Sequence, residues 1–223
     1  MKVHTIDERL QDVQLRIATA CLRSGRSPEE VILIAICKGF PPEAVREAVA
    51  AGLRHLGENR VQEAEAKRPG LSDLPPDVVW HMVGHLQTNK VKTALGLFDI
   101  IHSVDSLHLA EAISRRAPGP VPVFLEVNVA GEPTKYGFSP DELPRASEAV
   151  ARLPNLDLRG LMTVAPLVRD QEEVRPVFRR LRETARSLGL RELSMGMTDD
   201  FEAAVEEGAT HLRIGRAIFG ERG

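Results

Sequence analysis

A lysine that follows the longest apolar run of the chain is the residue best suited to covalent chemistry. The run Val31–Cys37 ends directly before Lys38, and the sequence has only 6 lysines against 23 arginines. Partial burial at a strand end disfavours the ammonium form and leaves the free amine that a Schiff base requires. The alternative is a lysine whose side chain extends from the strand end into water.

The stretch Ser194–Asp200 combines hydroxyl groups with a change from strand to helix. Thr198 or Asp199 is predicted to be the N-cap of that helix. Hydroxyl groups of Ser194 and Thr198 can donate to a phosphate, and backbone N–H groups at a helix N-terminus also bind one. The alternative is that these residues only cap the helix.

The stretch Arg213–Ala217 repeats the same change from strand to helix one unit later. Gly215 lets the backbone approach a phosphate closely, so the two neighbouring strand ends together favour a phosphate site. Arg213 precedes this glycine by two residues and can place a permanent cation in the same site. A structural ion pair of Arg213 with Glu58 or Asp105 is the alternative.

Two further features carry weaker signals. His81 and His85 are four residues apart, but they lie in a predicted strand without a nearby Cys or Asp cluster, which disfavours zinc. We expect His85 to make a polar contact at the rim of the site or to cap the next helix. Lys135 and Tyr136 lie in a loop that acts as a lid or is simply solvated.

The elements that must position these residues are eight short runs, several of them continuously apolar, as in parallel strands covered by helices. The predicted strands are Val31–Cys37, Arg54–Glu58, Val78–Val83, Ile100–Val104, Val121–Asn128, Leu158–Val164, Glu192–Met197 and His211–Ile214.

Amphipathic segments alternate with these strands, which predicts an α/β fold, a single (β/α)8 TIM barrel spanning residues 1–223. A doubly wound open sheet remains the alternative. Apolar residues at helical spacing before the first strand predict an extra N-terminal helix, and Pro69–Pro76 is expected to be a loop. Glycines are expected where three helices end, at Gly52, Gly189 and Gly208. In such a barrel the chemistry lies at the C-terminal ends of the strands.

Composition narrows the classes of function. The 223 residues are 43% hydrophobic and 27% charged with a net charge of −3, which disfavours nucleic-acid and anionic-membrane binding. The two cysteines, Cys21 and Cys37, suggest no disulfide framework. The N-terminus has no signal-peptide pattern and no apolar run is long enough to span a bilayer, so we expect a cytoplasmic protein.

Several ordered motifs closely resemble those of the YggS/PROSC family of pyridoxal 5′-phosphate (PLP) homeostasis proteins. The resemblance covers about Val31 to Gly220. The motifs that carry it are Ala35–Lys38, Gly57–Glu63, Trp80–Lys90, His102–Ser106, Val127–Val129, Lys135–Phe138, Gly160–Thr163, Leu193–Asp200 and Arg213–Gly220.

This resemblance implies the alanine racemase N-terminal barrel, which is PLP fold type III, with PLP held as an internal aldimine on Lys38. It implies that Arg213 faces the pyridine nitrogen, keeping it unprotonated and weakening the ring as an electron sink. The residues that match the phosphate-holding region are Ser194, Thr198, Gly215 and Arg216. Asn59 and Met162 fall in motifs that line the same cavity.

Two residues beside the lysine depart from the family pattern. Cys37 stands where members commonly have Ser, and Gly39 stands where they commonly have Thr. Neither change removes the amine of Lys38, but both alter the packing and hydrogen bonding around it. Cys37 is sensitive to oxidation only if it is exposed.

By resemblance the chain binds PLP, buffers or delivers it to apo-enzymes, and is not itself catalytic. Racemases of this fold use a second domain that supplies a tyrosine acid/base, whereas here Tyr136 is the only tyrosine. The second domain of those racemases also makes their usual dimer contact. Because we expect a single domain here, we expect a monomer. The alternatives are an amino-acid racemase or other PLP enzyme, and a barrel isomerase or aldolase that uses Lys38 on a sugar phosphate. Lys135 is a candidate second amine for PLP.

Overall fold

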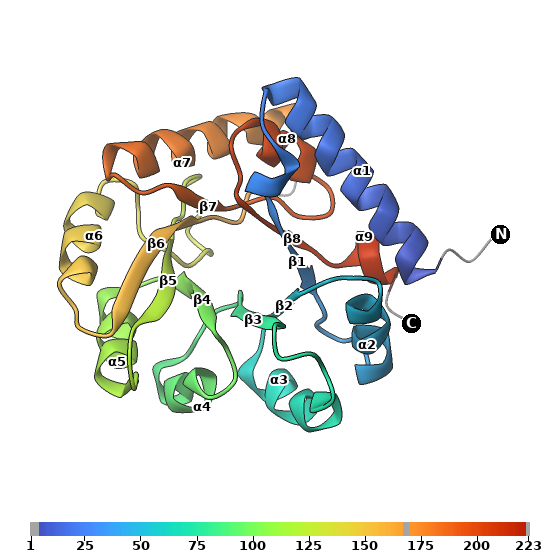
Figure 1. The fold of residues 1–223 in the computed structure, drawn as a ribbon. Coiled ribbons are helices and arrows are strands. Elements are labelled where there is room, and N and C mark those ends of the chain that lie inside the picture. The colour runs from blue at the N-terminus through green and yellow to red at the C-terminus, as the bar shows by residue number, and fades with distance from the viewer. Residues whose placement is uncertain (1–4, 167–169, 222–223) are drawn as a thin grey trace.

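Eight parallel strands form a closed barrel in the order in which they occur along the chain (Figure 1). The computed structural model describes residues 5–166 and 170–221. The predicted (β/α)8 barrel is confirmed, and the open sheet is excluded because β1 pairs with both β2 and β8. The strands are β1 (Ile32–Ile36), β2 (His55–Glu58), β3 (Val79–Met82), β4 (Ile100–Val104), β5 (Val121–Glu126), β6 (Leu156–Met162), β7 (Glu192–Ser194) and β8 (His211–Ile214).

Helices surround the barrel, and α1 lies along its outside beside α8 and α9 (Figure 1). The predicted N-terminal helix is therefore present. Among the residues described, no helix has the length and apolar character needed to cross a membrane. The α-helices are α1 (Ile6–Ser24), α2 (Pro42–Ala50), α3 (Val61–Lys67), α4 (Val91–Leu95), α5 (Leu107–Arg116), α6 (Leu143–Ala151), α7 (Arg175–Ser187), α8 (Phe201–Glu206) and α9 (Arg216–Phe219). Short 3-10 helices span Pro28–Glu30, Arg68–Leu71, Thr88–Lys90 and Gln171–Val174.

Strand and helix ends differ from the prediction in specific places. β7 ends three residues early, because Gly196 has a φ of +92° that departs from extended backbone. The predicted loop Pro69–Pro76 begins within a 3-10 helix. The predicted N-cap, Thr198 or Asp199, is wrong. Asp200 is the N-cap of α8, because the preceding residues form a turn in which the Asp200 carboxylate accepts from the Met197 N–H at 2.5 Å.

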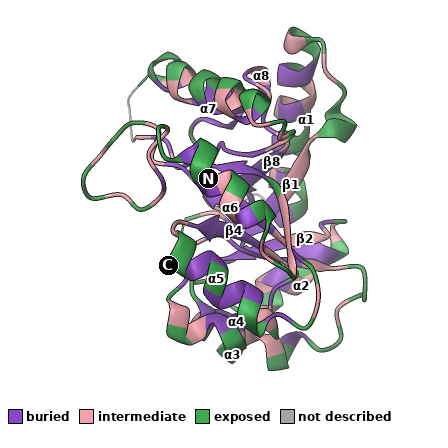
Figure 2. Ribbon diagram, turned by 90° about the vertical axis from the view of Figure 1, so that its left-hand side faces the viewer, coloured by how far each residue is buried: buried purple, intermediate pink, exposed green. Residues whose placement is uncertain are grey.

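Side chains on the strands alternate between the helices and the barrel interior, as the period of a strand requires. The large apolar core lies between strands and helices (Figure 2). A second, small apolar cluster of Ile34, Ile36 and Val83 fills part of the interior.

Much of the remaining interior is polar, because a chain of hydrogen bonds crosses it. The ring nitrogens of His55 and His81 lie 3.0 Å apart, and those of His81 and His102 lie 2.9 Å apart. His102 Nδ1 lies 2.8 Å from Ser194 Oγ, to which Arg213 donates at 2.7 Å. Because a guanidinium only donates, the serine accepts from it and can donate its own proton to His102.

The buried rings are held in the neutral form. Burial lowers the pKa of His81 and His102 well below the ordinary value, and neighbouring histidines lower it further. His211, whose ring packs edge-on against Phe124, has a pKa lowered to about 3, mainly by burial. Arg213 adds to the effect on His102 and His211 because its cation repels a second positive charge.

The neutral rings predict a loss of stability in acid. Above pH 6.5 these rings are neutral in both states, but below it only the unfolded chain takes up protons. The unfolding free energy then falls by up to about 1.4 kcal/mol per pH unit for each such ring. His211→Gln should reduce this slope, measured by urea unfolding between about pH 6 and 4, by up to that amount.

The exposed His108 of α5 supplies the matched control. His108→Gln should leave the slope as in the wild type, because His108 lies outside the buried chain of rings. A slope that His211→Gln does not change would contradict a neutral buried ring at this position.

Candidate functional site

Lys38 lies two residues beyond the end of β1, half-buried at the C-terminal mouth of the barrel. Ile34 and Ile36 face the interior, so the strand alternation places Lys38 on the same side. A tight turn follows, in which the Phe40 N–H donates to the Cys37 carbonyl at 3.1 Å. Gly39 adopts a φ of +73° in that turn, a conformation that a side chain disfavours. The departure at Gly39 therefore suits the turn that positions the amine.

A buried ion pair on the outer side of β1 and β2 holds the peptide before Lys38. Lys67 donates to the Cys37 carbonyl at 2.6 Å and pairs with the carboxylate of Glu58, whose side chain is 0% exposed. The Cys37 thiol donates to the same carboxylate at 3.3 Å. Burial, followed by the Glu58 charge, raises the pKa of Cys37 well above its ordinary value, so this cysteine is not a reactive thiolate.

Arg213 crosses the floor of the mouth and is 5% exposed. It donates to Ser194 Oγ at 2.7 Å and to the Thr163 carbonyl at 2.8 Å. Burial lowers its pKa to about 10, while Asp200 and Glu126 oppose the shift, so the guanidinium stays charged at neutral pH.

The alternative for Arg213, a structural ion pair with Glu58 or Asp105, is wrong because both carboxylates bind other residues. Glu58 faces outward and pairs with Lys67, because the alternation along β2 puts it on the helix side. Asp105 accepts from His85 Nδ1 at 2.8 Å. The predicted contact of His85 at the rim is thereby confirmed.

The residues predicted to hold a phosphate lie at two depths. Ser194 is fully buried and its hydroxyl is engaged by Arg213 and His102, below the rim. Thr198 is half-buried in the loop between β7 and α8. Arg216 is exposed, and its guanidinium forms an ion pair with Asp199.

Gly215 joins β8 to α9 next to the end of β1. A Cβ atom at Gly215 would lie 3.2 Å from the Ile36 carbonyl oxygen, which is tighter than ordinary packing. The absence of a side chain therefore brings this junction close to the strand that precedes Lys38. Backbone N–H groups in the first turn of a helix have no acceptor within the helix and are available to an anion.

Asn59 and Met162 lie at the same end of the barrel. Asn59 is half-buried directly after β2, and a Cβ atom at Gly84 would lie 2.3 Å from its carbonyl oxygen. Met162 is the buried last residue of β6, in register with Glu126 and Ser194. The structure thus brings the sequence-predicted residues together at the C-terminal ends of the strands.

Sequence reasoning missed Glu126, the last residue of β5. Its Oε2 atom is buried and, within the described part of the chain, has no hydrogen-bond partner. Burial, followed by the charge of Asp105, raises the pKa of Glu126 to about 7, although Arg213 opposes the shift. The signal in the sequence was a carboxylate at the inward-facing end of a strand, in phase with Phe124, whose ring stacks on His102.

A loop after β5 reaches across the mouth. The ring of Tyr136 stacks on His85 with centroids 3.9 Å apart and planes at 12°. Lys135 Nζ lies 2.6 Å from the Glu132 carboxylate and 3.3 Å from the Val164 carbonyl. The lysine proposed as a second amine is therefore engaged by two acceptors in this conformation.

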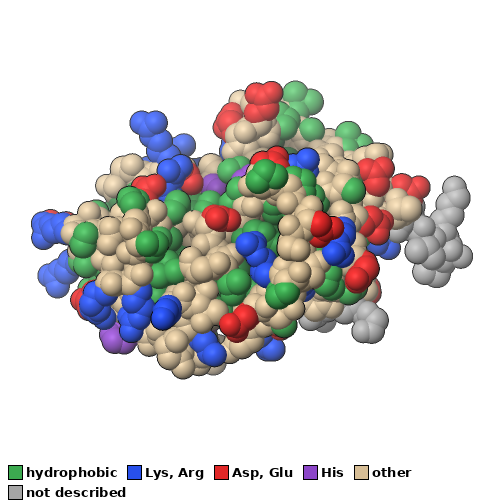
Figure 3. Space-filling model, turned by 60° about the horizontal axis from the view of Figure 1, so that its bottom comes forward, with side chains coloured by type: hydrophobic (Ala, Val, Ile, Leu, Met, Phe, Trp, Pro, Cys, Tyr) green, Lys and Arg blue, Asp and Glu red, His purple; other side chains and the backbone are tan. Residues whose placement is uncertain are grey.

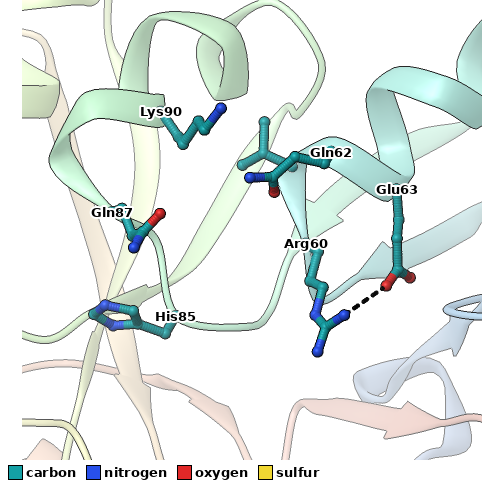
Figure 4. Close-up of a pocket in the computed structure, with 7 residues that line it drawn as sticks. Arg60, Gln62, Glu63, His85, Gln87 and Lys90 are labelled. Carbon is teal, nitrogen blue, oxygen red and sulfur yellow. Dashed lines mark hydrogen bonds and ion pairs between the residues drawn. The ribbon is translucent and has the colours of Figure 1, made fainter.

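A polar cavity of about 440 Å³ lies between the start of α3 and the connection from β3 to α4 (Figure 4). Arg60 and Gln62 come from the start of α3, and His85 and Lys90 face them from the connection between β3 and α4. Arg60 forms an ion pair with Glu63 at 3.5 Å, which partly neutralises this wall. Cationic and amide groups therefore continue from the barrel mouth onto the neighbouring surface.

Known proteins match this chain over nearly its whole length. The alanine racemase N-terminal domain family matches residues 35–223. The pyridoxal phosphate homeostasis protein of Pseudomonas aeruginosa is 47% identical, over 98% of this chain and 96% of that protein. That of Aquifex aeolicus is also 47% identical, over 96% and 97%. The structure of PipY from Synechococcus elongatus with PLP bound has a TM-score of 0.81 and 42% identity, and covers 93% of this chain and 100% of PipY.

The buried pair behind Lys38 predicts a large effect of a single substitution. Lys67→Met leaves the Glu58 carboxylate buried and unpaired, and should lower the unfolding free energy by about 3–5 kcal/mol. Urea unfolding measures this loss. The double variant Glu58→Leu with Lys67→Met should recover most of it, because no buried charge remains.

Lys92→Met on the exposed side of α4 is the control and should change stability by less than about 0.5 kcal/mol. If Lys67→Met is as mild as this control, the Glu58–Lys67 pair does not support the peptide of Cys37 as inferred.

Proposed function

We propose that this chain, which belongs to the pyridoxal phosphate homeostasis proteins of the alanine racemase N-terminal domain family, binds PLP through Lys38 and buffers or delivers it. The observation that carries the proposal is the position of one amine at the barrel mouth above a buried guanidinium. Lys38 lies two residues beyond β1, and Arg213 crosses the floor from β8 to the carbonyl of Thr163, just after β6. The PLP bound to PipY supports the choice of cofactor.

The groups around the mouth fit the chemistry of PLP. The cofactor supplies an aldehyde carbon, with which a lysine amine forms a Schiff base. The charge of Arg213 disfavours a proton on the pyridine nitrogen. Gly215 and Thr198 offer N–H and hydroxyl donors to the phosphate, and the positive charge of Arg216 adds to this anion site.

The remaining predicted residues act around these groups. Ser194 orients Arg213, with which it shares a hydrogen bond. Asn59 follows β2 and Met162 ends β6, so both would border the bound cofactor. The buried Oε2 of Glu126 is a polar atom left for a ligand at the same mouth.

We also propose a cytoplasmic monomer that meets apo-enzymes transiently. Both cysteines are buried thiols, as in a reducing compartment. Figure 3 shows acidic and basic side chains on the same face, which gives no support to a nucleic-acid surface there. The large apolar side chains exposed on the described residues, too few for the core of an obligate interface, are Leu15, Leu22, Leu107 and Tyr136.

Reduction with borohydride tests the role of Lys38. Protein made with ample vitamin B6 should show a visible absorption band that borohydride removes, and mass spectrometry should find the added mass on the Lys38 peptide. Lys38→Ala should lose both signals, while Lys135→Ala should retain them. A colourless protein with an unmodified Lys38 would overturn the proposal and favour sugar-phosphate chemistry instead.

Transfer to an apo-enzyme tests delivery. PLP-loaded protein mixed with an apo PLP-enzyme should restore its activity faster than the same protein held behind a dialysis membrane, because contact bypasses release into solution. The measurement is the rate of activity recovery at equal total PLP. Equal rates in the two arrangements would contradict delivery by contact, and the proposed function would be reduced to buffering of PLP.

A further inference from the structure

Glu126 lies across the barrel mouth from Lys38. In a closed barrel of strands β1 to β8, β5 is four strands from β1 in either direction. Glu126 ends β5, and Lys38 follows β1 at the same end of the barrel. The carboxyl group and the amine therefore face the same mouth from opposite walls.

Glu126 lines a cavity of about 180 Å³ between the end of β5, the loop that follows it and Val164 after β6. Val127, Val164 and the ring of Tyr136 give this cavity apolar walls. One carboxyl oxygen is buried without a partner. A short aliphatic chain with a polar head fits such a space, because the stem meets apolar walls and the head meets the carboxylate.

The charged groups around Glu126 are already engaged elsewhere. Arg213 of β8 binds Ser194 and Thr163, and Lys135 of the β5 loop binds Glu132. Within residues 5–166 and 170–221, the Glu126 carboxyl group forms no ion pair, and its Oε2 atom has no hydrogen-bond partner.

The acidic and aromatic neighbours complete this environment. Asp105 after β4 pairs with His85 after β3, and Tyr136 stacks on that imidazole. Asp105 disfavours a second negative charge and Arg213 favours it, so the two act on Glu126 in opposite directions. A carboxyl group in these surroundings can hold or release a proton at neutral pH.

We propose that Glu126 accepts a proton from an incoming primary ammonium group and so produces the amine that displaces Lys38 from PLP. This inference rests on the proposed function. It names the substrate class of the release step as a primary amine on a short aliphatic stem. A lysine side chain of an acceptor enzyme and a small free amine share this chemistry.

The step balances in protons and bonds. The ammonium gives its proton to the Glu126 carboxylate, which yields a neutral amine and a carboxylic acid. That amine would add to the cofactor carbon and pass its two N–H hydrogens to the Lys38 nitrogen, so that a C=N bond to the incoming nitrogen replaces the C=N bond to Lys38. The departing Lys38 amine then takes the proton from the Glu126 carboxyl group and ends as an ammonium. No oxidant or reductant is required.

The test compares two nucleophiles on PLP-loaded protein. Propylamine is charged at neutral pH and needs a base, whereas hydroxylamine is already neutral. In Glu126→Gln, release by propylamine should fall by about a hundredfold, within the range of general-base effects. Release by hydroxylamine should stay within about twofold of the wild type, because it has no proton to lose before attack.

The pH profile and two controls distinguish the loss of a general base from damage to the fold in Glu126→Gln. The wild-type rate with propylamine should have an inflection near pH 7 that Glu126→Gln lacks. Glu148→Gln, at an exposed carboxylate on α6, should leave both nucleophiles unaffected. In protein without PLP, carbon-13 NMR should show one carboxyl signal titrating near pH 7 that is absent from Glu126→Gln.

Equal release by propylamine in the wild type and in Glu126→Gln would overturn the inference. Borohydride labelling of Lys38 in Glu126→Gln shows whether the proposed function has failed as well. If Lys38 is still labelled, PLP binds through Lys38 and only the role of Glu126 as a base is contradicted. Repeating the comparison with an apo-enzyme separates the sources of amine. If Glu126→Gln slows transfer of PLP to the apo-enzyme, lysines of acceptor proteins are the amines of this step. If the substitution slows release by propylamine but not transfer to the apo-enzyme, small free amines are.

Discussion

A guanidinium buried inside the barrel is the constraint on which the rest of the site depends. Arg213 is 5% exposed, and removing its charge from water is unfavourable unless each donor finds an acceptor. Ser194 and the Thr163 carbonyl supply those acceptors. The cation in turn disfavours protonation of His102 and His211. Burial is the main reason that these two rings are neutral, and the charge of Arg213 reinforces that state on β4 and β8.

Contacts on both faces of β1 position Lys38. On the outer face, Lys67 and Glu58 hold the carbonyl and thiol of Cys37. On the inner face, apolar side chains fill the barrel below the lysine. Because both faces are packed, the strand end and the turn at Gly39 fix the backbone of Lys38 at the mouth. Within the described residues, Oε2 of Glu126 is a buried polar atom at this mouth without a hydrogen-bond partner.

The sequence predicted what depends on local pattern and missed what depends on register between distant strands. Apolar runs and turn glycines identified the eight strands and the end of β1 before Lys38, because burial and φ are properties of short segments. The contact of His102 with Ser194 joins residues 92 positions apart, and no local signal reports it. The alternative pairing of Arg213 with Glu58 stayed open at the level of the sequence for the same reason, since only the alternation observed in β2 shows that Glu58 faces the helices.

Arg213 also explains which chemistry this mouth favours. In the proposed complex, the cation of Arg213 beside the pyridine nitrogen would keep that atom unprotonated, so the ring would withdraw electrons weakly. Reactions that leave an electron pair on the cofactor lose their main source of stabilisation. Exchange of one amine for another leaves no such pair and needs only a proton acceptor near the reacting carbon. A barrel with a buried arginine on its floor and a carboxyl group of raised pKa on its wall is therefore better suited to holding and handing over PLP than to turning over substrates on it.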